Sequence, residues 1–322
     1  MSKDILPMRD SFFNALYDIA RKDKRVILVT ADCGAPSLDK FREDLRSQYF
    51  TVGIAEQNMI SIAAGLALEG KIVYTYAIAP FASLRCYEQI KVDLCCMNLP
   101  VTSLGIGAGL AYDIMGPTHH TTEDISIMRA LPNMTILNPS DSVMSGDFAK
   151  VSYEAAGPKY IRFDRGDLPL LYADRKIDYS KGLVELKKGS GLCIIATGVM
   201  VHKAIEISEE LSQYSINPGV IDVYRMKPMN EKLLLQIMSK YEHVVSLEEH
   251  FRIGGLGSAL SEIICDNEKN TRLMRFGICD KYYFEYGGRD RLHSLCRLDK
   301  KSVLGTIVSW VNAKDAVMAR GR

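Results

Sequence analysis

Charge imbalance and long apolar runs are both missing from this chain of 322 residues. Lys and Arg together number 40 and Asp and Glu 39, which gives a net charge of +1. Nucleic-acid binding usually shows as a basic excess, so this balance gives it no support. No run approaches the ~20 apolar residues that span a bilayer, and the N-terminus lacks the apolar core of a signal peptide. We therefore expect a soluble, cytoplasmic protein without nucleic-acid or membrane partners.

Cysteine spacings typical of metal or redox sites are also missing. None of the eight cysteines forms a Cys-x-x-Cys pair, so neither a zinc site nor a redox motif is predicted. Some lie in apolar runs, as Cys95 and Cys96 do, where cysteine packs as a small hydrophobe. The glycines at 105, 107 and 109 fit neither G-x-G-x-x-G nor a Walker motif. An irregular loop explains them as well as a phosphate site does.

Helical and strand patterns alternate along most of the chain. β-branched apolar runs predict buried strands at 25–30, 71–77 and 101–106. Apolar helical patterns predict helices at 55–68 and 81–97. Such alternation is typical of parallel sheets with helices on both faces. At about 150 residues per domain, the length predicts about two domains.

The alternation stops after residue 165 and restarts near residue 192. The intervening stretch is rich in Gly, Pro, Asp and Lys and has few periodic runs. We predict two doubly wound α/β domains, residues 1–170 and 190–322, joined by a linker at 171–189 that contains a small hairpin.

Glu56 is the first candidate for chemistry, because it follows a short strand and opens an apolar helix. A glutamate in this place is either an exposed residue near a helix N-terminus or a partly buried acid with a raised pKa. The apolar residues on both sides, such as Ile54 and Met59, argue against an exposed face.

Two other segments carry polar groups where α/β proteins bind ligands. A polar loop with the adjacent residues His119 and His120 precedes a helix, and such loops carry function more often than packing. Arg165 follows the last strand of the first domain, where it could clamp a phosphate or a carboxylate. The alternatives are an ordinary loop histidine and a surface salt bridge from Arg165 to Asp164 or Asp167.

Several motifs in one order resemble the transketolase family. They are Gly-Ile-Ala-Glu-Gln at 53–57, Arg-Cys-Tyr-Glu-Gln-Ile at 85–90, Gly-Pro-Thr-His-His at 116–120, Leu-Pro-Asn-Met at 131–134 and Pro-Ser-Asp at 139–141. Glu-Glu-His at 248–250 and Gly-Gly-Leu-Gly-Ser at 254–258 resemble the C-terminal domain of that family. The similarity covers nearly the whole chain. It implies a pyrimidine-binding domain followed by a transketolase C-terminal domain, as in the separate C-terminal subunit of two-chain transketolases, with deoxyxylulose phosphate synthase as a near relative.

The resemblance implies thiamine diphosphate as cofactor and transfer of a two-carbon ketol unit from a ketose or ketose phosphate to an aldose. Glu56 matches the glutamate that hydrogen-bonds the aminopyrimidine ring, which makes it a catalytic residue together with His119. Ile54 and Phe81 are carried over as cofactor contacts, although Phe81 could equally be an ordinary core aromatic. For the substrate, His119 matches a contact to sugar hydroxyls and Arg165 a contact to the phosphate. Arg9 and Ser37 are carried over as further phosphate contacts.

The sequence also departs from the family pattern. Met115 stands where transketolases have an aspartate, with Asp113 two residues before it, and Gly107 stands where they have a histidine. Both positions concern substrate recognition, so an unusual sugar is a live expectation. The Gly-Asp-Gly motif of the metal and diphosphate site is absent from the chain. We therefore expect an N-terminal-type partner subunit that holds most of the divalent metal site, with Mg as the expected ion, and two copies of each chain.

Two other functions remain open from the sequence alone. The β subunit of a 2-oxoacid dehydrogenase has a similar size, domain pair and dependence on a partner. A non-catalytic scaffold that keeps the fold belongs to another functional class, because fold does not fix function.

Overall fold

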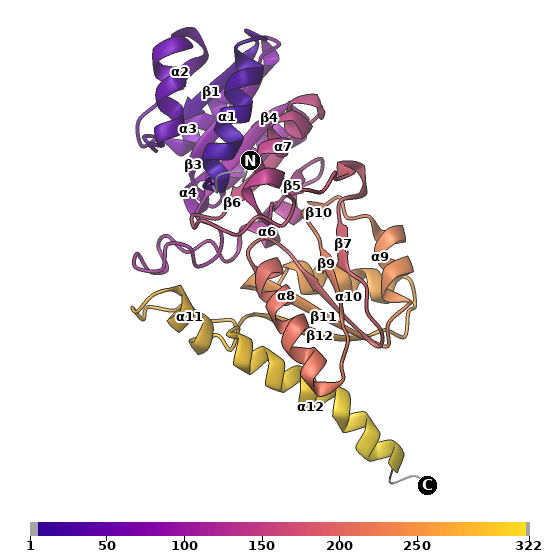
Figure 1. Cartoon of the computed structure of the whole chain (residues 1–322). Coiled ribbons are helices and arrows are strands. Elements are labelled where there is room, and N and C mark those ends of the chain that lie inside the picture. Colours follow the sequence, from indigo (N-terminus) through magenta and orange to yellow (C-terminus); the bar gives the residue numbers. More distant parts are fainter. Residues whose placement is uncertain (1–5, 320–322) are drawn as a thin grey trace.

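A computed structural model describes residues 6–319, and its first domain is built on a seven-stranded sheet (Figure 1). The strand order is β10-β5-β6-β4-β3-β1-β2. The strands are β1 (Val26–Thr30), β2 (Tyr49–Thr51), β3 (Ile72–Ile78), β4 (Val101–Ile106), β5 (Thr135–Leu137), β6 (Lys159–Phe163) and β10 (Arg225–Lys227). All pair in parallel except β10, which is antiparallel to β5. The second half of the chain therefore contributes an edge strand to the first sheet.

Helices cover both faces of this sheet, as the alternating pattern predicts. On one face, α1 (Met8–Ala20) packs against α7 (Ser142–Glu154); the other carries α3 (Glu56–Leu68) and α6 (Asp124–Arg129). Because successive side chains of a strand point to opposite faces, Val73 joins one apolar cluster and Tyr74 the other. Short helical turns at η1 (Pro36–Leu38), α2 (Asp39–Asp44) and η2 (Arg46–Gln48) connect β1 to β2.

The single helix predicted at 81–97 is wrong in one respect, because it is broken. It consists of α4 (Ala79–Ser83), α5 (Tyr87–Gln89) and a stretch of π-helix, η3 (Ile90–Cys96). The backbone of Cys86 leaves helical geometry at φ −114° and ψ 24°, and its thiol donates to the carbonyl oxygen of Phe81 at 3.4 Å. Arg85 lies in this break and forms an ion pair with Glu56.

The second domain has a five-stranded sheet in the order β12-β11-β8-β9-β7. Its strands are β7 (Val184–Lys187), β8 (Leu192–Ala196), β9 (Gly219–Asp222), β11 (His243–Phe251) and β12 (Arg272–Ile278). Its helices are α8 (Met200–Leu211), α9 (Glu231–Met238), α10 (Leu256–Asp266), α11 (Arg289–Leu295) and α12 (Lys300–Ala319), with the turns η4 (Tyr179–Lys181) and η5 (Ser212–Tyr214). In Figure 1, α12 runs along the outside of this domain and projects beyond it. Two α/β domains are thereby confirmed.

The hairpin predicted within the linker is wrong. The second part of the linker forms the single strand β7, which pairs antiparallel with β9 at the edge of the second sheet. Gly189 follows β7 at a place without room for a side chain, since a Cβ there would lie 2.1 Å from the backbone nitrogen of Gly219. The chain thus enters the second sheet before the alternating pattern becomes visible in the sequence.

A buried polar cluster joins the two domains. Arg162 Nε lies 2.8 Å from a carboxylate oxygen of Asp124, and both side chains are almost fully buried. Tyr160 donates to the same oxygen at 2.8 Å. From the second domain, Glu248 accepts the backbone N–H groups of Leu256 at 2.6 Å and Gly257 at 2.8 Å. The buried His250 lies between the two groups, 3.9 Å from a carboxylate oxygen of Asp124 and 3.9 Å from one of Glu248. Buried charges need such partners, so the cluster spans both domains.

Candidate functional site

The candidate residues converge because they follow parallel strands of one sheet. Glu56 comes after β2, Phe81 after β3, His119 in the loop after β4 and Arg165 after β6. Parallel strands place their carboxyl ends at the same sheet edge, which is where open α/β sheets bind ligands. The structure therefore brings together groups that are separated by more than 100 positions in the sequence.

Glu56 is the first residue of α3 and is buried, with 2% of its surface exposed. This excludes the alternative of an exposed residue at the helix terminus. One carboxylate oxygen, Oε2, accepts a hydrogen bond from Arg85 Nη1 at 2.7 Å. Within the described residues no hydrogen bond reaches the other oxygen. A buried acid with one oxygen available is able to bind a ring nitrogen or another donor of a ligand.

A row of three rings with an arginine at each end extends from Glu56 to the far side of the site. The guanidinium of Arg85 lies over the ring of Phe81 at 4.0 Å, and that ring meets His119 edge-on at 5.2 Å. His119 in turn lies 5.8 Å from the ring of Tyr112. The guanidinium of Arg165 closes the row, 4.8 Å from the same tyrosine ring. Cation–π contacts of this kind hold an arginine in place without neutralising its charge.

The loop after β4 owes its shape to glycine. Gly107 has φ +97°, and a Cβ at this position would lie 2.1 Å from the Tyr112 ring. Gly109 has φ +60° and bridges to Thr121 in both directions, at 3.0 and 2.8 Å. Glycine adopts such backbone angles at no steric cost. The glycines therefore serve to fold this loop back on itself and to seat Tyr112, as the irregular-loop alternative expected.

The two adjacent histidines have different surroundings. His119 is partly exposed, and its Nδ1 lies 2.9 Å from the hydroxyl of Thr118. Burial, and then the charge of Arg85, lower its pKa, which favours a neutral imidazole at neutral pH. His120 is buried, with no hydrogen-bond partner for Nε2 in the described part of the chain. Only His119 belongs to the row of rings and cations.

Arg9 and Ser37 lie together, but both are engaged by one carboxylate. Arg9 forms two hydrogen bonds of 3.1 Å to Asp10, and the Ser37 hydroxyl donates to Asp10 at 2.6 Å. Arg9 still influences the site electrostatically. Burial raises the pKa of Tyr112, and the positive charge of Arg9 partly opposes that rise. The roles of Arg9 and Ser37 as phosphate contacts stay a prediction.

Ile54 and Met115 lie at the exposed rim of the site, whereas Gly107, the other departure from the family pattern, is buried. Ile54 is 75% exposed and Met115 49% exposed. Asp113 accepts the backbone N–H of Arg289 at 2.9 Å and so is committed to α11. Gly107 leaves its space to Tyr112. Tyr112 rather than Asp113 therefore shapes the part of the site where the sequence departs from the family.

Neither a metal cluster nor a membrane-spanning helix occurs within residues 6–319. No group of three or more His, Cys, Asp or Glu side chains in that range is arranged to hold a metal ion. Within the same range, no helix combines the length and the apolarity that crossing a bilayer requires.

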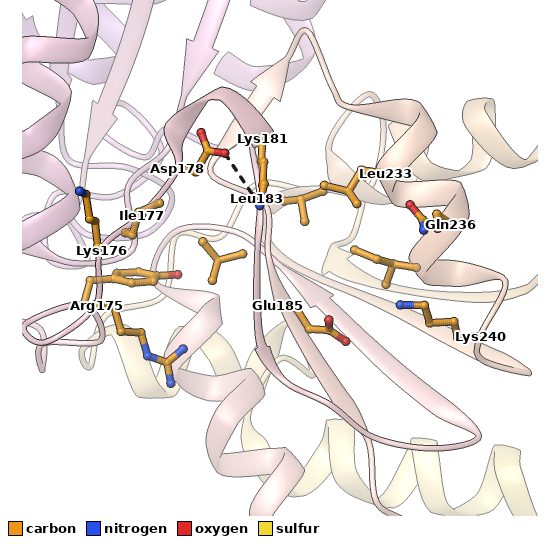
Figure 2. Close-up of a pocket in the computed structure, with 13 residues that line it drawn as sticks. Arg175, Lys176, Ile177, Asp178, Lys181, Leu183, Glu185, Leu233, Gln236 and Lys240 are labelled. Atoms are coloured by element: carbon orange, nitrogen blue, oxygen red, sulfur yellow. Dashed lines mark ion pairs between the residues drawn. The ribbon is translucent and has the colours of Figure 1, made fainter.

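A separate cavity of about 350 Å³ lies between the segment around η4 and helix α9 (Figure 2). It is lined by the basic residues Arg175, Lys176, Lys181 and Lys240, the acidic residues Asp178 and Glu185, and an apolar floor that includes Leu183 and Leu233. None of the candidate residues lines it. The clustered chemistry of the molecule is therefore at the edge of the first sheet and not in this cavity.

Sequence reasoning missed the roles of three residues in the site. Arg85 belongs to a motif of the sequence, but its pairing with Glu56 from the turn between α4 and α5 carried no pattern signal. Tyr112 carried no pattern signal beyond its place after a glycine-rich run. Arg289, which bonds Asp164 and Glu249, lies in a stretch without periodicity. Arg165 makes no ion pair with Asp164 or Asp167 within residues 6–319, so the surface salt-bridge alternative is wrong.

Comparison with known proteins agrees with this geometry. The family "Transketolase, pyrimidine binding domain" matches residues 5–169, and "Transketolase, C-terminal domain" matches residues 181–303. The chain is 32% identical over 313 residues to an apulose-4-phosphate transketolase subunit of Phocaeicola vulgatus, covering 97% of this chain and 99% of that protein. It is 35% identical over 300 residues to 6-deoxy-6-sulfo-D-fructose transketolase subunit SqwH of Clostridium sp., covering 92% of each.

A solved structure described as a split gene transketolase, inactive beta4 tetramer, superimposes with a TM-score of 0.83. It shares 30% sequence identity with this chain, and the match covers 94% of this chain and 97% of that one. Both domain matches, the relatives of equal length and the shared fold lead to one conclusion. The chain belongs to the transketolase family of transferases, and it consists of that family's pyrimidine-binding domain followed by its C-terminal domain.

Proposed function

We propose that this chain is the C-terminal subunit of a two-chain, thiamine diphosphate-dependent transketolase. The complex transfers a two-carbon ketol unit from a ketose or ketose phosphate to an aldose acceptor. The observation that supports this most directly is the buried Glu56 carboxylate, which Arg85 links to the Phe81 ring, in a chain that belongs to this family. Relatives that are named for transketolase action on sugar derivatives are consistent with this reaction class.

The residues present fit a thiamine cofactor. Its aminopyrimidine needs an acid for a ring nitrogen and an aromatic surface for its face, and Glu56 and Phe81 stand on neighbouring elements at the site. When bound, thiamine diphosphate supplies the stabilised carbanion that a protein side chain cannot. Glu56 holds the proton at the ring nitrogen, and burial keeps that exchange away from bulk water. Ile54 is the third proposed cofactor contact.

The substrate side of the site is assigned to the other end of the row. His119, with its lowered pKa, is neutral near pH 7 and is able to donate or accept a hydrogen bond to the hydroxyls of the donor sugar. Arg165 is held over Tyr112, makes no ion pair within residues 6–319, and is suited to bind a phosphate in bidentate fashion. Arg9 and Ser37 take part only if Asp10 releases them.

A partner subunit is part of the proposal. The chain has no Gly-Asp-Gly motif, and similar proteins of equal length are named as one subunit of a transketolase or as its C-terminal section. The partner would hold the diphosphate and the divalent metal, taken to be Mg²⁺, in an assembly with two copies of each chain.

The test uses the complex of this chain with its partner, purified from cells that make both. Glu56→Gln keeps the size of the side chain but removes the acid, so we expect turnover to fall by about 10²–10⁴, as for a lost general acid or base. Glu69→Gln is the matched control, because Glu69 is exposed at the other end of α3. Native mass spectrometry shows whether both variants still bind the partner.

Two outcomes would contradict the proposal. Equal turnover by the Glu56→Gln and wild-type complexes would favour a non-catalytic scaffold. Decarboxylation of a 2-oxoacid without transfer to an aldose would favour the β subunit of a 2-oxoacid dehydrogenase.

A further inference from the structure

Arg289 links the second domain to the two segments that carry Tyr112 and Arg165, although it contacts neither of these residues itself. It is the first residue of α11, which Figure 1 shows beside the loop that follows β4. Its backbone N–H donates to Asp113 at 2.9 Å, on the residue directly after Tyr112. Its side chain binds Asp164, the residue directly before Arg165. Both attachments therefore end next to the contact between Tyr112 and Arg165.

The guanidinium of Arg289 lies between two buried carboxylates from different domains. It donates from Nη1 to Asp164 at 3.0 Å and from Nε to Glu249 at 2.8 Å, and Nη2 contacts both acids. The exposed fractions of the Asp164 and Glu249 side chains are 3% each. Such a fork is geometry that lysine cannot reproduce.

Asp164 and Glu249 differ in the hydrogen-bond partners that would remain to them if Arg289 were removed. Glu249 would still accept a bond of 2.6 Å from His293, which in turn contacts Lys203 at 2.7 Å. Among the described residues, the Asp164 side chain has one other hydrogen bond besides those to Arg289, of 2.9 Å from the backbone of Gly166. Asp164 would thus be left as an uncompensated carboxylate beside Arg165.

We propose that Arg289 is a positioning residue that keeps Arg165 available for an anionic substrate. It binds the Asp164 carboxylate from the side of the second domain, so that this carboxylate does not neutralise Arg165. It also fixes Asp113 and, through it, the Tyr112 ring on which Arg165 rests. This inference rests on the proposed function, because it assigns Arg165 to an anionic group of the donor.

The proposal makes a prediction that a purely structural role does not. Loss of Arg289 frees Asp164 to pair with Arg165, which weakens binding of a phosphorylated donor more than binding of the same sugar without phosphate. With the partner chain present, Arg289→Met raises the KM for a ketose phosphate by about tenfold, the loss of about one charge-assisted contact, and changes kcat by less than about twofold. The KM for the unphosphorylated ketose stays within about twofold of the wild-type value.

The second-site variant and the control sharpen this test. Adding Asp164→Asn to Arg289→Met removes the freed carboxylate, so the KM for the ketose phosphate returns toward the wild-type value. Arg291→Met is the matched control, since Arg291 is exposed on the same helix and its side chain makes no ion pair among the described residues. If Arg289→Met does not fold, Arg289→Lys is compared instead, with an intermediate KM expected because the charge is kept and the fork is lost.

Binding of inorganic phosphate to the full chain, followed by ³¹P line broadening, gives a readout apart from turnover. Phosphate binds wild type and the double variant alike, and binds Arg289→Met about tenfold more weakly. Arg165→Gln removes this binding. Equal effects on both donors, or no recovery in the double variant, would overturn the role of Arg289. A wild-type complex that binds phosphate at Arg165 but transfers no ketol unit would overturn the proposed function and leave this inference standing.

Discussion

The surroundings of Asp222 lead us to expect that the free energy of unfolding of this protein falls as the pH rises. It is the last residue of β9 and is fully buried where the two domains meet. One carboxyl oxygen accepts hydrogen bonds from Tyr172, at 2.6 Å, and from Ser140. The other oxygen has no partner in the described part of the chain. Burial raises the pKa of Asp222 to about 7, which its two hydrogen bonds only partly oppose.

The size and the sign of the effect follow from this pKa. An aspartate in an unfolded chain has a pKa of ~3.9, and each pH unit of difference is worth ~1.4 kcal/mol. The native state therefore binds more protons than the unfolded state between about pH 4 and pH 7. Through this window the free energy of unfolding falls by ~4 kcal/mol because of Asp222, and above it no further loss occurs. Asp222→Asn removes the titration while an amide oxygen still accepts the two hydroxyl groups.

Urea unfolding at pH 4.5, 5.5, 6.5 and 7.5 measures this contribution as the difference between variant and wild type. We expect the free energy of unfolding of Asp222→Asn to gain on that of wild type by ~3 kcal/mol from pH 4.5 to pH 7.5, since the lowest pH already lies above the unfolded pKa of ~3.9. Asp174→Asn, at an exposed position of the preceding linker, should show no such change. Glu248, whose pKa burial also raises to about 7, contributes equally to both proteins and cancels. A difference that is the same at all four pH values would refute the reasoning.

Two further predictions concern Gly107 and Arg162. Gly107→Ala forces a Cβ to within 2.1 Å of the Tyr112 ring at a φ of +97°, so we expect kcat/KM for a ketose phosphate to fall by about tenfold or more; an unchanged value would show that the ring is not needed. Arg162→Met leaves Asp124 as a buried unpaired charge, which costs ~3–5 kcal/mol in urea unfolding. Adding Asp124→Asn should recover most of that loss, and equal stability of wild type and Arg162→Met would contradict the ion-pair argument.

The sequence predicted that the candidate residues follow strand ends, and their convergence in the structure follows from strand order. A strand followed by a loop or helix carries Glu56, Phe81, His119 and Arg165 in turn, and parallel pairing brings the strand ends together. Both features are local patterns that a periodicity analysis detects. The motifs of the transketolase family fall on the same strand ends, which is why the two lines of reasoning met.

The contacts between these residues were not predictable, since they depend on breaks in the local pattern. Arg85 pairs with Glu56 from the turn that interrupts the helix at 84–86, and nothing in the apolar pattern of 81–97 marks that interruption. Arg289 and Asp164 are separated by 125 positions and belong to different domains, so no local pattern relates them. The short edge strands β7 and β10 have too few residues to show alternation.

The distribution of charge between the domains accounts for the dependence of the site on both of them. Two arginines of the first domain, Arg85 and Arg165, lie at opposite ends of the row of rings. Arg85 is balanced by Glu56 within that domain, whereas Arg165 has an acidic neighbour, Asp164, that would neutralise it. A first domain alone would therefore present a self-neutralised anion site. The second domain supplies Arg289, which engages that neighbour, and it does so from a helix that also fastens the loop of Tyr112. We therefore propose that the C-terminal domain acts on substrate binding through charge compensation, although none of its side chains belongs to the row of rings and cations.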